Sequence, residues 1–245
     1  MKKWIVILFA MLPSLAMAAG AGVPLDKANV DLSDKAALQN GAKLFMNYCF
    51  ACHSTQYQRY ERVADDLGIP ADLMKENLMF NPESKIGDLM VNAMPPKQAA
   101  AWFGAPPPDL TLVARVRGAD WLYTYLRTFY VDPSRPFGVN NLVFPSVGMP
   151  HVLEELQGIP NPVYGTKVVD GKEVQVVVGV ESDGTGELSE GEYDEAVLDL
   201  VSFLVYSGDP VKAERHALGW WVMAFLVLFT IVVVLLKKEY WRDVH

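Results

Sequence analysis

Cys49-Phe50-Ala51-Cys52-His53 is the stretch from which the interpretation of this chain starts. Two cysteines three positions apart, with a histidine directly after the second, form the attachment signature of a c-type haem. The two thiols add to the two vinyl groups of one porphyrin, and the adjacent histidine becomes the proximal ligand to iron. Cys49 and Cys52 are the only cysteines of the chain. The sequence therefore predicts one haem c, attached covalently through Cys49 and Cys52 and ligated by His53.

A redox dithiol and half of a zinc site are the two other uses of such a cysteine pair. Neither explains the histidine that follows Cys52 directly, and a structural zinc site needs four nitrogen or sulfur ligands. No second pair of such ligands lies nearby in the sequence. Haem attachment is the interpretation that uses all three side chains.

The N-terminal residues have the pattern of a secretory signal peptide. Lys2 and Lys3 precede a short apolar run, and Ala16-Met17-Ala18 matches a small-residue cleavage site. We expect residues 1–18 to be a signal peptide, because the apolar run is too short to span a bilayer. The whole chain has a formal net charge of −8, and cleavage would remove two lysines and no acid. The predicted mature chain is therefore more acidic still.

A second apolar segment, residues 217–236, lies near the C-terminus and carries no charge. At about 1.5 Å rise per residue it would be about 30 Å long as a helix, which matches the hydrocarbon core of a bilayer. It is apolar on every face, unlike a core helix with a polar stripe. We expect a single transmembrane helix in a bacterial inner membrane, with residues 19–210 in the periplasm and residues 237–245 in the cytoplasm.

The exported body, residues 19–210, is predicted to be mainly α-helical with long irregular loops and a small β-hairpin. Asp170-Gly171 between β-branched runs predicts the hairpin. Proline-rich stretches predict irregular chain over 81–108, and residues 131–165 are also expected to be loop-like. Apolar periodicity predicts helices over 34–48, 58–67, 70–78 and 189–206, and a short aromatic helix from Asp120.

The first and last of these helices carry specific end signals. Ser33 is the expected N-cap of the first, followed by an acid in the first turn. Ser189 and Glu192 have the spacing of a capping box at the start of the last. Gly41, on the apolar face of the first helix, would let the last helix cross it closely.

The second axial ligand of the iron is left open by the residues themselves. An electron-transfer haem is normally six-coordinate, and a thioether ligand raises its potential. Met94 and Met149 each stand before a proline on irregular chain, which holds them extended. Spacing and composition do not separate these two. Four other methionines are expected to fill the core: Met46, Met74, Met79 and Met90.

Two further stretches carry a family pattern. One is Pro107-Pro108-Asp109-Leu110-Thr111-Leu112-Val113-Ala114-Arg115-Val116-Arg117, followed by an acidic-aromatic helix start. The other contains Asn140-Asn141, Phe144-Pro145 and Gly148-Met149-Pro150. With the single C-terminal anchor, they resemble the cytochrome c1 family, the haem c subunit of the cytochrome bc complex (ubiquinol–cytochrome c reductase). The resemblance covers nearly the whole mature chain, and the hairpin is its least diagnostic part.

This resemblance implies a class I cytochrome c-like haem domain and assigns its ligands. It implies that Met149, and not Met94, is the second axial ligand. It also implies that the Pro108 carbonyl accepts the ring N–H of His53, which would fix the tautomer and the ring orientation.

The same resemblance implies that Arg117 pairs with a haem propionate, because a guanidinium binds a carboxylate bidentately. Surface ion pairing is the alternative for Arg115 and Arg117. The family usually has tyrosine where this chain has Trp121, so the role of that position does not carry over directly.

By this resemblance the chain is a non-catalytic electron carrier of a quinol–cytochrome c reductase. It would take one electron from a Rieske iron–sulfur protein and pass it to a soluble or tethered cytochrome c. Cytochrome b, the Rieske protein and the membrane are its expected partners, in a dimeric complex and without nucleic acid.

Two alternatives to this function stay open: a free-standing membrane-tethered shuttle, and a haem enzyme or sensor with an open distal site. Residues 181–195 hold seven acids and no base. They indicate either a solvated face or a docking patch for a basic partner.

Overall fold

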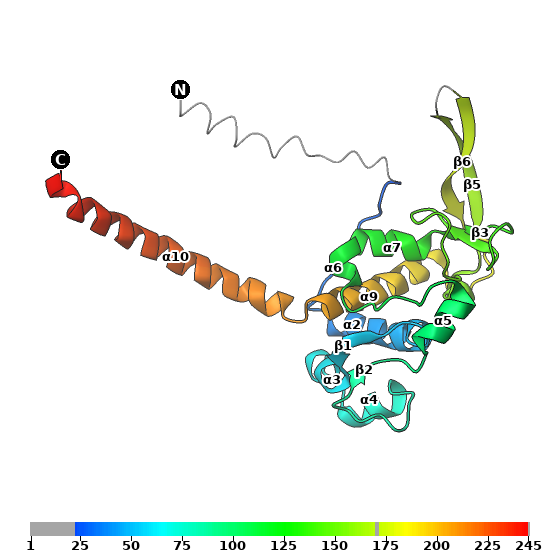
Figure 1. Ribbon diagram of the computed structural model, residues 1–245, viewed down its shortest axis with the longest axis horizontal. Helices are drawn as coiled ribbons and strands as arrows, with labels where there is room; N and C mark the ends of the chain where they lie inside the picture. Colours follow the sequence, from blue (N-terminus) through cyan, green and yellow to red (C-terminus); the bar gives the residue numbers. More distant parts are fainter. Residues whose placement is uncertain (1–22, 170–171, 245) are drawn as a thin grey trace.

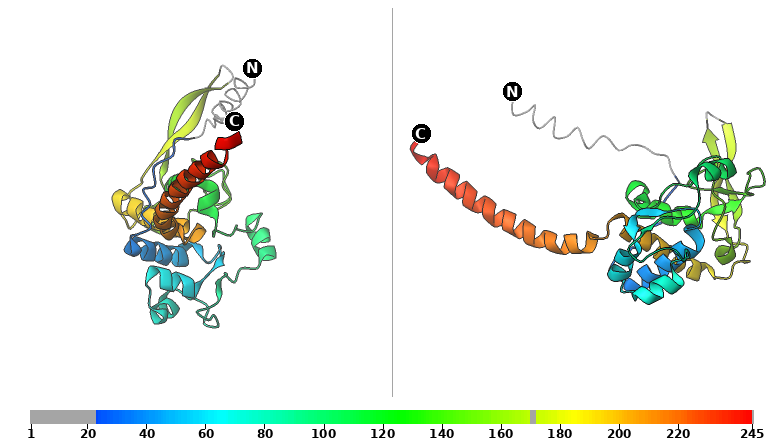
Figure 2. Two further views of the ribbon diagram at one scale, coloured as in Figure 1. Left: turned by 90° about the vertical axis from the view of Figure 1, so that its left-hand side faces the viewer. Right: turned by 60° about the horizontal axis from the view of Figure 1, so that its bottom comes forward.

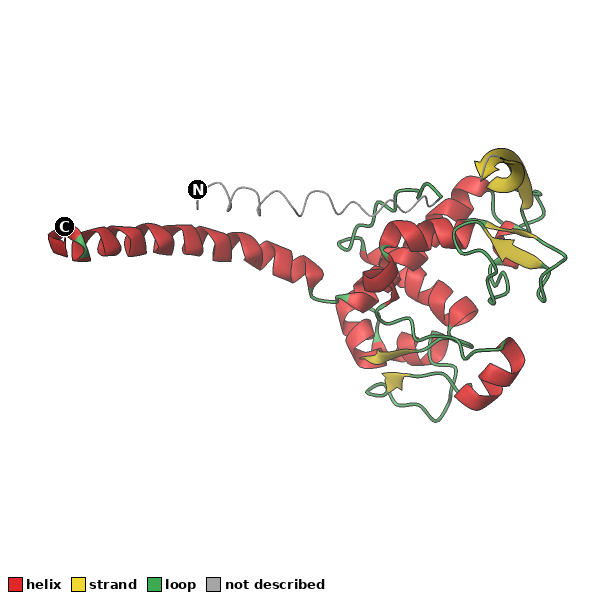
Figure 3. Ribbon diagram, turned by 45° about the horizontal axis from the view of Figure 1, so that its top comes forward, coloured by secondary structure: helices red, strands yellow, loops and turns green. Residues whose placement is uncertain are grey.

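The computed structural model describes residues 23–169 and 172–244. The predicted signal peptide at 1–18 and the hairpin turn at 170–171 therefore lie outside the described residues. Figure 1 shows a mainly helical body in which helices α2 (Lys35–Leu44) and α9 (Glu190–Gly208) lie at the centre. Figure 3 shows that long loops connect the shorter helices and that the strands form small separate pairs. The predicted mainly helical haem-domain architecture is confirmed.

Helix α2 leads directly to the cysteine motif. Asp34 caps it, since its carboxylate accepts hydrogen bonds from two backbone N–H groups of the first turn. The predicted cap at Ser33 is wrong by one position, because the Ser33 hydroxyl donates to Asp31 instead. At its C-terminal end the helix continues as the π-helical turn η2 (Phe45–Cys49). The predicted helix over 34–48 is confirmed, and it delivers the chain to Cys49.

Helices α2 and α9 cross at very close range. A Cβ atom on Gly41 would lie 2.1 Å from the carbonyl oxygen of Asp199 and 2.8 Å from the Cβ of Phe203. Next to this contact, the Asn40 amide donates to the Asp199 carboxylate at 2.8 Å. The Phe45 and Phe203 rings are 5.5 Å apart. The predicted close crossing at Gly41 is confirmed.

Helix α9 begins with the predicted capping box. The Ser189 hydroxyl and N–H both donate to the Glu192 carboxylate, at 2.6 and 3.0 Å. The helix runs to Gly208, two residues beyond the predicted end. Its core-facing stripe is buried: Tyr193, Val197, Leu200, Val201 and Leu204.

The segment after the cysteine motif differs in part from the prediction. Strand β1 (Thr55–Arg59) pairs antiparallel with β2 (Leu89–Met90), so the helix predicted at 58–67 begins later, as α3 (Tyr60–Leu67). Pairing with β2 keeps the backbone extended through Arg59. Helix α4 (Ala71–Asn77) agrees with the prediction at 70–78.

A further helix, α5 (Pro96–Phe103), lies in the stretch predicted to be irregular. The proline argument was wrong here because Pro96 is the first residue of the helix, where its missing N–H is not needed. The prolines on either side of the helix remain in loops.

The middle of the chain contains two consecutive short helices, α6 (Val113–Arg117) and α7 (Ala119–Arg127). Gly118 separates them with a φ of +90°, a conformation that residues with a side chain rarely adopt. The predicted helix from Asp120 is confirmed as α7, which starts one residue earlier. The remaining elements of this part are β3 (Phe129–Val131), β4 (Val139–Asn141) and α8 (Glu154–Gln157), the first two paired antiparallel.

Two elements extend away from the body in Figure 1, and Figure 2 draws them from two further sides. One is the predicted hairpin, formed by β5 (Asn161–Val169) and β6 (Lys172–Glu181) and longer than expected. The other is α10 (Lys212–Tyr240), a helix of 29 residues that is long and apolar enough to cross a membrane. It contains the span predicted at 217–236.

The long loop before Met149 is held by asparagine side chains. Asn141 is fully buried, and its amide donates to the Tyr125 carbonyl at 2.7 Å. Its side-chain oxygen accepts the N–H groups of Val143 and Phe144, at 2.9 and 3.0 Å. One side chain therefore satisfies three backbone groups and fixes the loop to α7.

Replacing Gly41 with alanine should lower the free energy of unfolding by about 2–3 kcal/mol, because the added methyl group forces the two helices apart. Thermal unfolding of the full-length protein in detergent, followed by circular dichroism, measures this loss. Gly191→Ala is the matched control, since a Cβ at this helical position meets no atom within 4 Å. Equal stability of the two variants would contradict the close crossing.

Asn141→Ala should cost about 2–4 kcal/mol of unfolding free energy, because it leaves buried backbone groups without partners. Denaturant unfolding of the variant gives the value. Asn77→Ala, on the exposed face of α4, is the control and should change stability by less than about 0.5 kcal/mol. A loss no larger than that of the control would rule out the anchoring role of Asn141.

Candidate functional site

The two cysteines lie on one turn at the end of η2. The N–H groups of Cys52 and His53 both donate to the Cys49 carbonyl, at 3.1 and 2.8 Å. Both thiols are free. Burial raises the pKa of Cys49 to about 12 and also raises the pKa of Cys52. Two protonated thiols, three positions apart on one turn, are the chemistry that attachment to a single porphyrin requires.

The ring of His53 is held by the Pro108 carbonyl, 2.7 Å from Nδ1. A carbonyl oxygen only accepts hydrogen bonds, so Nδ1 carries the proton and Nε2 keeps its lone pair. Burial lowers the pKa of His53 and favours the neutral ring, although the bond to Pro108 acts in the opposite direction. This is the tautomer that a histidine needs in order to bind a metal through Nε2.

The loop that carries Pro108 is fastened to the chain directly after the motif. The Leu110 N–H donates to the Ser54 carbonyl, and the Gln56 N–H donates to the Asp109 carboxylate, both at 2.8 Å. Asp109 was not predicted as a site residue. A carboxylate directly after two prolines is a common turn-forming signal that could have indicated it.

The two neighbouring arginines of α6 have different surroundings. Arg115 lies 3.5 Å from the Asp209 carboxylate, as the surface-pairing alternative requires. The guanidinium of Arg117 lies 5.0 Å from the ring centre of Trp121 and 5.8 Å from that of Phe144. Within the described part of the chain, no carboxylate lies within 4 Å of Arg117. Its charge is therefore available to an acidic group that the chain does not supply.

Met149 is joined to Arg117 through two stacked rings of α7. The Trp121 and Tyr125 rings are 4.9 Å apart and nearly parallel. The Tyr125 hydroxyl donates to the Met149 sulfur at 3.4 Å. Burial raises the pKa of Tyr125, so the phenol keeps its proton near neutral pH.

The two groups of predicted site residues share one core. Cys49 and Tyr125 belong to the same buried cluster, and Trp121 and Met149 pack against it. Met94, the other methionine left open, lies on the loop before α5, where its N–H donates to Asn92. The four methionines predicted as core filler are buried, as expected: Met46, Met74, Met79 and Met90.

The donor set of these residues fits a covalently attached haem. It comprises two free thiols on one turn, one imidazole with a free Nε2, one thioether and one guanidinium without a carboxylate. A haem needs thiols for its vinyl groups, axial ligands for its iron and a cation for its propionates.

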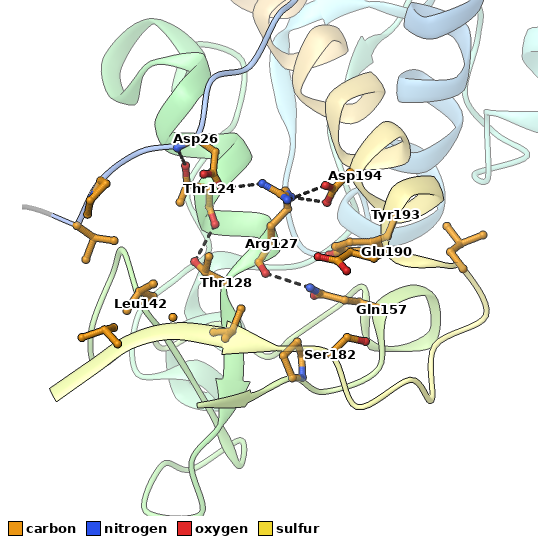
Figure 4. Close-up of a pocket in the computed structure, with 17 residues that line it drawn as sticks. Asp26, Thr124, Arg127, Thr128, Leu142, Gln157, Ser182, Glu190, Tyr193 and Asp194 are labelled. Carbon is orange, nitrogen blue, oxygen red and sulfur yellow. Dashed lines mark hydrogen bonds and ion pairs between the residues drawn. The ribbon is translucent and has the colours of Figure 1, made fainter. Parts of the chain in front are cut away.

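A separate hollow of about 310 Å³ lies between the N-terminal arm, α7, α9 and the hairpin (Figure 4). Arg127 crosses it and pairs with Asp194 on one side and with Asp26, at 2.6 Å, on the other. The Arg127 carbonyl accepts a hydrogen bond from Gln157 at 3.0 Å. Because this guanidinium is already neutralised, the hollow is a structural junction, and the predicted haem residues do not line it.

Comparison with known proteins gives a family and several relatives. The model of the "Cytochrome C1 family" matches residues 27–244. Cytochrome c1 of Allochromatium vinosum is 50% identical over 246 residues, which cover all of both chains. A protein of Nitrosomonas europaea named ammonia monooxygenase gamma subunit is 45% identical, over 100% of this chain and 99% of the relative. Cytochrome c1 of Blastochloris viridis is 27% identical, over 86% of this chain and 82% of the relative.

The family match spans the described chain from residue 27 through the C-terminal helix. It includes each residue predicted from the sequence to hold the haem: Cys49, Cys52, His53, Pro108, Arg117 and Met149. Haem c and electron transport follow from the family as a whole. The chain therefore belongs to the cytochrome c1 family.

Proposed function

We propose that this chain is the membrane-anchored haem c subunit of a cytochrome bc complex in a bacterial inner membrane. Residues 19–210 form the periplasmic haem domain after removal of residues 1–18, residues 217–236 span the membrane and residues 237–245 are cytoplasmic. Family membership and the apolar helix α10 support this arrangement. The observation that carries the proposal is the 2.7 Å bond from His53 to Pro108, which leaves Nε2 free beside two free thiols.

In this proposal the chain itself supplies both axial ligands. Cys49 and Cys52 would hold the porphyrin through thioether bonds, and His53 Nε2 and Met149 Sδ would be the ligands of its iron. When bound, the haem supplies a one-electron ferric–ferrous couple. The residues around it make and break no substrate bond.

The surrounding residues fix these ligands and exclude water. Pro108 holds the imidazole ring, and Asp109 holds the loop of Pro108 through the Gln56 N–H. Arg117 would bind a propionate of the haem and offset its charge. A ligand set fixed in this way changes little between the two oxidation states, which keeps the cost of electron transfer low.

The proposed electron path runs from a Rieske iron–sulfur protein to a soluble or tethered cytochrome c. Cytochrome b is a further partner, in a dimeric complex. The acidic stretch 181–195 supports a basic acceptor, although three of its acids have structural partners: Asp183, Glu192 and Asp194. Four exposed acids remain for docking: Glu181, Glu187, Glu190 and Glu195.

A haem enzyme or sensor with an open distal site is the alternative function. One relative at 45% identity is named as a monooxygenase subunit, which is a reason to test it. Carbon monoxide distinguishes the two functions. The native reduced protein should not bind it promptly if a thioether occupies the sixth position. A free-standing shuttle is excluded if cytochrome b and an iron–sulfur protein co-purify with this chain.

Met149→Leu should abolish six-coordination and lower the midpoint potential, because the thioether ligand is lost. A redox titration with visible spectra of the purified variant measures both effects, and carbon monoxide should then bind the ferrous form. Met94→Leu is the matched control and should keep the native spectrum and potential. The opposite pattern would assign the ligand to Met94.

Replacing Glu187, Glu190 and Glu195 together with glutamine should slow electron transfer to a basic cytochrome c by about tenfold at low salt, because electrostatic steering is weakened. The difference should fade as salt screens the charges. Stopped-flow reduction of the acceptor over a salt series gives the rates. Glu76→Gln with Glu83→Gln, on α4 and the turn after it, is the control, and an equal loss there would argue against a local docking patch.

A further inference from the structure

We infer that Tyr125 positions the Met149 thioether and raises the potential of the haem through its hydroxyl hydrogen bond. This inference rests on the proposed function, in which Met149 Sδ binds the iron. The hydroxyl oxygen lies 3.4 Å from the sulfur. Among the residues that the structure describes, the Tyr125 hydroxyl contacts no other acceptor.

The hydrogen bond leaves the sulfur able to act as a ligand. A thioether sulfur carries two lone pairs and is a weak acceptor. One lone pair faces the Tyr125 hydroxyl, and the other remains for a metal. The phenol therefore limits the orientations in which the Met149 side chain can lie.

The Tyr125 ring itself is held from several sides. The ring centre of Trp121 lies 4.9 Å from that of Tyr125 in a stacked pair, and the ring centre of Phe129 lies 5.2 Å away in an edge-on pair. Its backbone carbonyl accepts the buried amide of Asn141 at 2.7 Å. The ring is almost fully buried, so the hydroxyl has a fixed position from which to donate.

The segment that carries Met149 is also fixed to the same aromatic group. Phe129 stacks on His151, two residues after Met149, with ring centres 4.9 Å apart and an angle of 12° between the planes. Donor and acceptor are therefore both attached to one rigid cluster. The surrounding packing therefore holds the Tyr125 hydroxyl and the Met149 sulfur close enough to form their hydrogen bond.

The direction of the effect follows from the chemistry of the ligand. A hydrogen bond withdraws electron density from the sulfur and makes it a poorer donor. A thioether favours ferrous iron overall, but the electron density that its sulfur does donate stabilises ferric iron more than ferrous iron. Withdrawing part of that density therefore disfavours the ferric state further. Groups that form hydrogen bonds to the ligands of a metal are known to change its reduction potential.

Tyr125→Phe in the full-length protein tests the inference, because it removes the hydroxyl and keeps the ring. The variant should remain six-coordinate, with the weak far-red absorption band of methionine-ligated ferric haem. Its midpoint potential should fall, so that the ferrous-to-ferric ratio at a fixed ambient potential drops by about two- to tenfold. Tyr123→Phe is the matched control, since this ring lies under the Arg127 guanidinium and should leave the potential unchanged.

A second measurement tests the same hydrogen bond without replacing any residue of the native sequence. Incorporation of 3-fluorotyrosine makes every tyrosine hydroxyl a stronger donor, and it should raise the potential of the native sequence. The same substitution in the Tyr125→Phe chain should have no effect on the potential. A shift of equal size in both chains would overturn the inference.

Failure of the inference and failure of the proposed function give different results. If the native protein lacks the far-red band, Met149 is not a ligand, and the proposed function fails together with the inference. If the native band is present but Tyr125→Phe keeps the native potential, the inference alone is overturned.

Discussion

The close crossing of α2 and α9 at Gly41 is the constraint on which the rest of this molecule depends. The carbonyl of Asp199 occupies the space where any larger residue would place its side chain. Because α2 continues into η2, this contact sets the position of Cys49 relative to the core. Because α9 leads to α10, the same contact relates the turn of Cys49 and Cys52 to the long apolar helix. One backbone contact therefore aligns the two ends of the body.

The irregular parts of the body acquire their order from side chains that bind backbone groups. Asn141 does this for the loop before Met149, and Asp109 does it for the loop of Pro108. Such loops have no ladder of repeated backbone hydrogen bonds. A single polar side chain therefore often makes several hydrogen bonds to the backbone groups of the loop. The loops that carry Pro108 and Met149 are thus fastened by side chains where no regular backbone ladder is present. Proline-rich chain fastened in this way could wall the cofactor site of the proposed function.

Features that depend on a local pattern of residues could be predicted from the sequence. The capping box of α9 and the helix that leads to Cys49 follow from residues close together in the chain, and the crossing was predicted from Gly41 as a small residue on an apolar helix face. The start of α3 was missed because β1 pairs with a strand about thirty residues later, a non-local contact that periodicity does not register. The contact of Tyr125 with Met149 and the different surroundings of Arg115 and Arg117 were likewise beyond the sequence. Each of these depends on which side chains the loops bring together.

The junction between body and anchor limits how far the haem domain can travel. Only residues 209–211 separate α9 from α10, and the Asp209 carboxylate binds Arg115 of α6 and Arg215 of α10 at the same time. A connection this short, with an ion pair across it, leaves the body little freedom to move relative to α10. A long flexible linker would allow much larger displacements. The body and α10 are therefore held together by a short, ion-paired connection. In the proposed function, any long-range movement between electron donor and electron acceptor would therefore be made by the partner proteins.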